Sequence, residues 1–113
     1  FREYDIWKSS IQIAKQVYLI SELFPSSEKF GLSSQIQRAV ISIASNIAEG
    51  SARKSEKEFA HFLEIAQGSA FEVETQLILA KEIGYIQESS LVELLKTIHV
   101  LQKQINYLRS KLK

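Results

Sequence analysis

Apolar residues recur at alternating spacings of three and four along most of the chain. The longest run lies near the C-terminus and comprises Leu91, Leu94, Ile98, Leu101, Ile105, Leu108 and Leu112. The preceding stretch keeps the same rhythm in Phe59, Leu63, Ala66, Ala70, Val73, Leu77 and Ala80. Shorter runs are formed by Ile36, Val40, Ile43 and Ile47, and by Ile6, Ile13, Val17, Ile20 and Phe24. This spacing keeps one stripe of an α-helix facing a partner helix, so it predicts four amphipathic helices.

Turn residues and capping signals set the bounds of these helices. We predict helices over about residues 5–24, 35–49, 56–82 and 91–112. The first stops before Pro25, because the residue before a proline avoids the α region. The other three begin at capping boxes, in which a serine is followed three residues later by Gln or Glu: Ser34, Ser55 and Ser90. Gly50 and Gly84 can adopt the left-handed conformation that closes a helix.

Four such helices with short connections form an antiparallel, up-down-up-down four-helix bundle. The chain of 113 residues is 45% hydrophobic and 24% charged, which fits one all-α domain over residues 1–113. It contains no cysteine, so disulfides and thiolate metal sites are excluded. No apolar run approaches the ~20 residues of a membrane helix, and the charged start does not resemble a signal peptide. We therefore expect a cytoplasmic protein that does not contact a membrane.

The predicted helices carry more apolar surface than one bundle core requires. The first has a second stripe, Trp7, Ile11, Ala14 and Tyr18. The second adds Ile41, Ala44 and Ala48, and the third adds Phe71 and Ile78. Soluble monomers rarely leave such patches exposed. This surplus favours self-association through the first-helix stripe, and a core that wraps wider within one chain is the alternative.

A polar stripe runs beside the apolar one on the second helix. It comprises Gln35, Ser42, Asn46 and Glu49, with Arg38 at its edge. A matching set, Ser69, Glu72 and Gln76, flanks the apolar stripe of the third helix. Partly buried polar groups need hydrogen-bond partners, so the two sets are expected to face each other or a neighbouring subunit. We interpret them as a polar seam that fixes register rather than as a ligand site.

Charge is distributed unevenly, although the net charge is only +1. Residues 55–95 carry −6 and residues 96–113 carry +5. Basic side chains can bind phosphates, and an acidic segment can meet the basic segment of another subunit. The candidate phosphate-binding residues are Arg53, Lys54, Lys57, Lys96, Lys103, Arg109 and Lys111. A second interpretation of the C-terminal bases is a solvated helix end that complements its own dipole.

The sequence contains one partial metal-binding motif and no complete catalytic motif. Glu58 and His61 form a Glu-x-x-His motif, but a di-iron bundle needs a second one, and Lys96 stands three residues before His99. His61 is also predicted on the outer face of its helix. The chain lacks a Gly-x-Ser-x-Gly elbow, a P-loop and a dinucleotide fingerprint. We therefore expect no enzyme activity, no cofactor and no metal.

The stretch over residues 24–50 resembles the signature of the four-helix bundle proteins encoded within ribosomal-RNA intervening sequences. The likeness continues through Arg53, Ser55, Glu58, Phe59, Phe62, Leu63, Ala66, Gly68, Ser69, Glu72, Glu74, Gln76 and Leu77. It implies a bacterial, cytoplasmic protein that forms a homopentameric ring. The chain is also similar to the accessory variability protein of diversity-generating retroelements, a ring of this fold that binds nucleic acid and a reverse transcriptase. That protein is markedly basic, and this chain departs from it with a net charge of +1.

Two functional hypotheses follow. In the first, the ring binds RNA or DNA through its basic clusters, each repeated in every subunit. In the second, the ring is a scaffold that docks a partner protein and contacts no nucleic acid.

Overall fold

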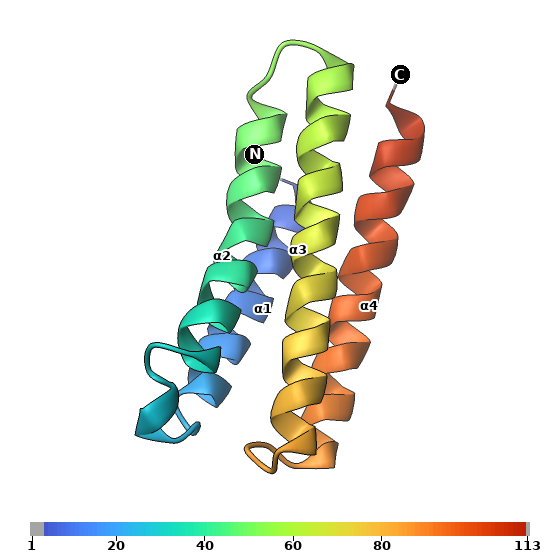
Figure 1. Ribbon diagram of the computed structural model, residues 1–113. Helices are drawn as coiled ribbons and strands as arrows, with labels where there is room; N and C mark the ends of the chain where they lie inside the picture. The colour runs from blue at the N-terminus through green and yellow to red at the C-terminus, as the bar shows by residue number, and fades with distance from the viewer. Residues whose placement is uncertain (1–3, 113) are drawn as a thin grey trace.

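The computed structural model describes residues 4–112 and contains four long helices packed side by side (Figure 1). They are α1 (Asp5–Ser21), α2 (Leu32–Ser51), α3 (Glu56–Glu82) and α4 (Glu88–Lys111), with a short 3-10 helix η1 (Ser26–Glu28) between the first two. Successive helices run in opposite directions, so the bundle has the predicted antiparallel, up-down-up-down arrangement. The all-α fold is confirmed.

The predicted apolar stripes converge on one core. The largest fully buried side chains come from all four helices: Ile13, Val17, Ile36, Val40, Ile43, Ile47, Leu63, Val73, Leu77, Ile98, Leu101 and Ile105. At the C-terminal end of α4, the apolar residues Leu108 and Leu112 are only partly buried. Packing is closest between α2 and α3 and loosest, among the four pairs of adjacent helices, between α1 and α4.

The helix start predicted at Ser55 is confirmed. The Ser55 Oγ accepts a hydrogen bond from the Glu58 N–H at 3.1 Å, and α3 spans the predicted residues. Helix α1 stops at Ser21, three residues before the approximate end predicted for the first helix. A turn over residues 22–24 then leads into Pro25.

The other two predicted capping boxes are wrong. Helix α2 begins at Leu32 rather than after Ser34, because the Glu28 Oε1 accepts the Leu32 N–H at 3.0 Å. Helix α4 begins at Glu88, two residues before Ser90. At the start of α2, the Glu28 carboxylate from the preceding turn therefore takes the capping role that the sequence assigned to a serine.

The two glycines expected to close helices have different roles. Gly84 has a φ of 86° and follows the end of α3, as predicted. Gly50 lies inside α2, so its predicted role as a closing residue is wrong. A Cβ at Gly50 would lie 2.6 Å from the Phe62 Cβ of α3. This position is occupied by glycine because the two helices approach each other there.

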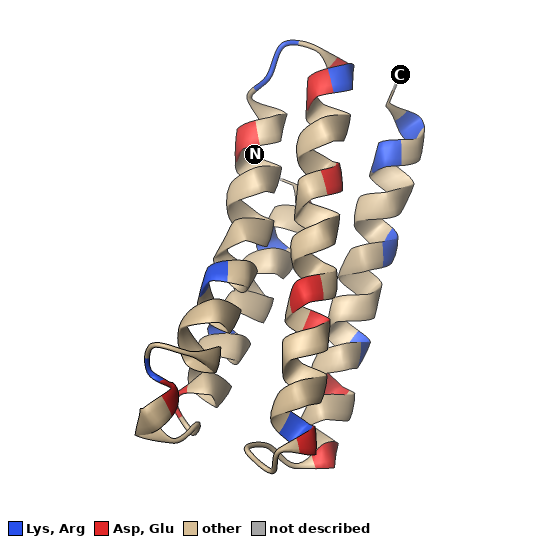
Figure 2. Cartoon of the chain, viewed as in Figure 1, with Lys and Arg blue, Asp and Glu red and all other residues tan. Residues whose placement is uncertain are grey.

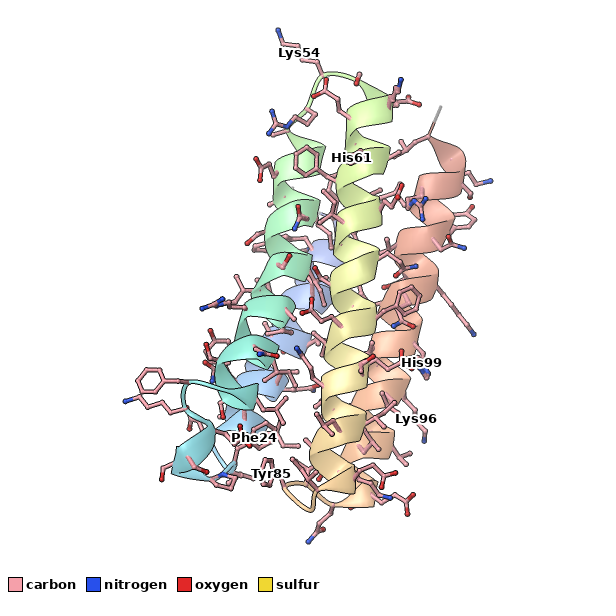
Figure 3. The ribbon with its side chains drawn as sticks, in the orientation of Figure 1. Phe24, Lys54, His61, Tyr85, Lys96 and His99 are labelled. Carbon is pink, nitrogen blue, oxygen red and sulfur yellow. The ribbon has the colours of Figure 1, made fainter. Side chains whose placement is uncertain are left out.

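A tyrosine and a glutamate join the two connections at one end of the bundle. The Tyr85 hydroxyl, between α3 and α4, donates a 2.6 Å hydrogen bond to the Glu28 Oε2 in η1. The Phe24 and Tyr85 rings also lie 5.4 Å apart between centroids, and Figure 3 shows them together. The hydrogen bond from Tyr85 lowers the pKa of Glu28, and the same bond raises the pKa of Tyr85. We call this the Glu28–Tyr85 end.

Candidate nucleic-acid interface

The antiparallel topology brings two basic segments to the end of the bundle opposite Glu28 and Tyr85. Arg53 and Lys54 lie in the connection between α2 and α3, and Lys57 lies in the first turn of α3. Arg109 and Lys111 lie in the last turn of α4. Figure 2 shows both segments at the same end of the molecule. We call these five residues the basic end.

Several side chains of the basic end have partners within the chain. The Arg53 Nη2 lies 2.8 Å from the Glu49 Oε1, and the Arg53 guanidinium lies 4.9 Å from the centre of the Phe62 ring. The Arg109 Nη2 lies 3.6 Å from the Glu64 Oε2. These ion pairs are partly solvated, and surface ion pairs contribute little stability. Lys54 extends away from the bundle into solvent (Figure 3).

The remaining two candidate bases are placed elsewhere. Lys96 and Lys103 are exposed on the middle of α4 and line shallow hollows between α4 and α1. The hollow beside Lys96 has a volume of about 260 Å³, and the one beside Lys103 about 370 Å³. The structure therefore separates the predicted basic residues into the five of the basic end and two that border a groove.

The predicted polar seam is partly satisfied inside one chain. Ser69 Oγ donates to Ser42 Oγ at 2.9 Å, which joins α3 to α2. Asn46 Nδ2 donates to the Ser42 carbonyl oxygen at 2.8 Å and lies 2.9 Å from the Ser42 Oγ. The outer members of the stripe are exposed: Gln35, Arg38, Glu49 and Glu72. Ser42 and Ser69 thus show that the two polar sets face each other at this level.

The apolar stripe predicted on the first helix is half-buried by its own chain. Trp7, Ala14 and Tyr18 pack against the core, and Ile11 is also half-buried. More strongly exposed apolar side chains lie on other helices. Phe71 and Ile78 of α3 are 54% and 40% exposed, and Val100 and Tyr107 of α4 are 55% and 66% exposed. The sequence reasoning missed Val100 and Tyr107, although their spacing of seven residues was a usable signal.

The histidines lie in separate surface environments. His61 is exposed on α3 beside the Phe62 ring, and the His99 Nε2 lies 3.4 Å from the Glu74 Oε2. Within residues 4–112, no three or more His, Asp or Glu side chains are grouped as metal ligands would be. No helix in the same range is long and apolar enough to cross a membrane.

Comparison with known proteins identifies the family. Residues 2–107 match the 23S rRNA-intervening sequence protein family. The match includes Arg53, Lys54 and Lys57 of the basic end and stops before Arg109 and Lys111. The chain belongs to this family. A solved structure with the same fold is a protein of unknown function from the S23 ribosomal protein family of Bacteroides thetaiotaomicron. It is 25% identical, with a TM-score of 0.85 over 92% of this chain and 97% of that one.

Neither the 23S rRNA-intervening sequence protein family nor that structure is described as an enzyme. A comparison with proteins of curated function found no match.

Proposed function

We propose that this member of the 23S rRNA-intervening sequence protein family is a cytoplasmic, non-enzymatic homo-oligomer whose basic end binds nucleic-acid phosphates. The observation that carries the proposal is the meeting of five basic residues, from segments more than fifty residues apart, at one end of the bundle.

The partners of the basic end are compatible with phosphate binding. Glu49 and Glu64 pair with Arg53 and Arg109 at partly solvated positions, so a phosphate can replace either carboxylate at small cost. Lysine and arginine contacts to phosphate carry no base information. Binding is therefore expected to tolerate different sequences. Repetition of the basic end in each subunit of an oligomer raises the overall affinity without further contacts.

Fluorescence anisotropy with labelled, mixed-sequence RNA and DNA tests this proposal. Phosphate contacts release counterions, so affinity should fall steeply, by roughly tenfold or more, between low and physiological salt. Lys54→Glu combined with Lys57→Glu should weaken binding by at least about tenfold at low salt. The matched control is Lys8→Glu with Lys15→Glu, which makes the same charge change on the exposed surface of α1 and should leave affinity nearly unchanged.

Nucleic-acid binding would be contradicted if correctly assembled wild-type protein at tens of micromolar left the labelled RNA and DNA unbound at low salt. Equal losses of affinity in the two charge-reversed variants would instead indicate a general charge effect and no special role for the basic end.

A protein-docking scaffold is the second candidate, favoured by apolar exposure at the Glu28–Tyr85 end. Leu19 and Leu23 are 67% and 74% exposed, and Phe30 is 90% exposed. Exposed apolar side chains of this size are typical of protein contacts. Under this candidate, Leu23→Glu with Phe30→Glu should abolish capture of a partner protein and leave assembly and nucleic-acid affinity unchanged.

A further inference from the structure

Two exposed stripes on different helices have the same layout and opposite charge. The α3 stripe comprises Glu64, Phe71, Ile78 and Glu82. The α4 stripe comprises Lys96, Val100, Tyr107 and Lys111. Each stripe has two apolar residues in the middle and a charged residue at either end.

Helix geometry places the members of each stripe on one narrow face. At 3.6 residues per turn, the α3 stripe covers an arc of about 40° and the α4 stripe about 60°. Each apolar pair is seven residues apart, which is roughly 10 Å along the helix. The outer acids are roughly 27 Å apart and the outer bases roughly 22 Å apart, on the same scale of ~1.5 Å per residue. Both stripes therefore present an apolar patch of similar length between two charged residues, and the spacing of these charges differs by about one helical turn.

A groove beside the α4 stripe can receive apolar side chains. It lies between α1 and α4, where packing between adjacent helices is loosest. Three hollows follow it, with volumes of about 380, 260 and 370 Å³. Their apolar lining includes Ile6, Ile20, Leu94, Val100, Leu101 and Tyr107. Lys96 and Lys103 border two of the hollows, and Glu93 and Asp5 also line the groove, so the groove has an apolar floor and a margin with charges of both signs.

We propose that the α3 stripe of one copy docks on the α4 stripe and the adjoining groove of a second copy. Complementary charge identifies the occupant: α3 carries six acids and two bases, whereas residues 96–111 of α4 carry four bases and no acid. The proposal rests on the homo-oligomeric part of the proposed function. It assigns Lys96, Lys103 and Lys111 to the contact between subunits and leaves Arg53, Lys54, Lys57 and Arg109 of the basic end to nucleic acid.

The contact joins two different surfaces and is therefore heterologous. Such a contact repeats from copy to copy and makes a ring when the rotation closes. The chain measures 43 × 25 × 20 Å, so one long side is comparable to the roughly 800 Å² that each partner contributes to a standard interface. Phe71, Ile78, Val100 and Tyr107 would be covered at its centre, where apolar contacts contribute most to binding.

Mixing two variants tests the heterologous contact. Phe71→Glu places a charge in the apolar centre of the α3 stripe, and Val100→Glu places one in the apolar centre of the α4 stripe. Each variant alone should have the 12.9 kDa mass of one chain by light scattering after gel filtration, at a concentration where the wild type assembles. A mixture should form a 1:1 dimer of about 26 kDa, twice that mass, because one intact stripe of each kind remains.

Circular dichroism shows whether both variants remain folded, which is expected since the two side chains are more than half exposed. Leu19→Glu is the matched control, because Leu19 is also exposed and belongs to neither stripe; it should assemble like the wild type. Assembly of either stripe variant at wild-type mass, or a mixture that stays monomeric, would overturn the inference.

The failure of this inference and the failure of the proposed function are distinguishable. A monomeric wild type ends both the inference and the homo-oligomeric proposal. Wild-type assembly that is unaffected by the stripe variants ends the inference alone. Nucleic-acid binding by the monomeric Phe71→Glu variant, weakened by further change at Lys54 and Lys57, would support the basic end independently of assembly.

Discussion

The two ends of the bundle are built differently. At the Glu28–Tyr85 end, side chains from two connections bond to each other, and the Glu28 carboxylate accepts two hydrogen bonds. At the basic end, the connection between α2 and α3 is short, charged and exposed. Its ion pair between Arg53 and Glu49 joins neighbouring turns, not separate connections.

The two ends therefore differ in whether their charged groups are used in hydrogen bonds within the fold or remain accessible to a ligand. The acceptor atoms of Glu28 are used within the fold, so they are not free to meet a ligand. Among the described residues, the cationic groups of Arg53, Arg109 and Lys111 lie beside partly exposed carboxylates or aromatic rings, and surface ion pairs of this kind contribute little stability. The fold thus fixes one end through hydrogen bonds across its connections and keeps charge accessible at the other.

The largest expected effect is at the helix contact that supports the basic end. Gly50→Val would place a side chain where a Cβ already lies 2.6 Å from the Phe62 Cβ and 3.0 Å from the Phe59 ring. Overpacking of this kind costs roughly 1–3 kcal/mol. Urea unfolding followed by circular dichroism measures the loss.

Gly68→Val is the matched control for this substitution. Gly68 lies on the exposed side of α3, and a Cβ there has no atom within 4 Å among the described residues. Valine and glycine differ in helix propensity by less than ~0.5 kcal/mol, so stability should hardly change. Equal losses at both glycines would show that the close approach at Gly50 is not the cause.

A smaller effect is expected at the start of α3, next to the basic end. Ser55→Ala removes the hydroxyl that accepts the Glu58 N–H and should cost about 1 kcal/mol. Ser90→Ala is the comparison, because Ser90 lies inside α4 and does not cap it. Thermal unfolding should separate the two variants, and a similar loss for both would contradict the capping assignment.

The smallest effect is expected at the partly exposed Glu28–Tyr85 hydrogen bond. Tyr85→Phe removes the hydroxyl and keeps the ring near Phe24, so a slight decrease in the unfolding temperature is expected. Glu28→Gln should decrease it further, because the acceptor of the Leu32 N–H is weakened as well. A decrease for Tyr85→Phe as large as that for Gly50→Val would reverse the predicted order of the two ends.

The Glu28–Tyr85 hydrogen bond also predicts a pH dependence. The pKa of Glu28 is lowered from its usual 4.5 by Tyr85 and by the Leu32 N–H. Its contribution to stability is therefore present above pH 4.5 and is lost as the pH falls through the lowered value. Glu28→Gln should remove this part of the acid dependence. Unfolding scans between pH 7 and pH 3 on both proteins measure the difference, and identical profiles would contradict it.

The fold could be predicted because its main signal is periodic and local. The spacing of residues such as Ile43, Leu77 and Ile98 decides which face of each helix is buried, and all three are fully buried. The helix ends were harder, because their caps depend on contacts across the fold. Glu28 caps α2 from the preceding turn, and Gly50 is required by Phe62 of another helix.

The candidate sites were predictable only in part. The basic segments were visible in sequence, and their meeting at one end follows from the antiparallel order of the helices. The separation of Lys96 and Lys103 from that end depends on which side of α4 faces α1. Trp7 and Tyr18 suggested a second apolar stripe, but their own bundle half-buries them, and only packing could reveal this.

The close approach at Gly50 has a further consequence for any ligand of the basic end. Contact between the backbone of α2 and the Phe59 and Phe62 side chains of α3 fixes the span between the last turn of one helix and the first turn of the next. Arg53 and Lys57 are attached on either side of that span. Their backbone positions are therefore preorganised, so a phosphate chain that matched their spacing would bind without an entropic penalty for ordering the connection.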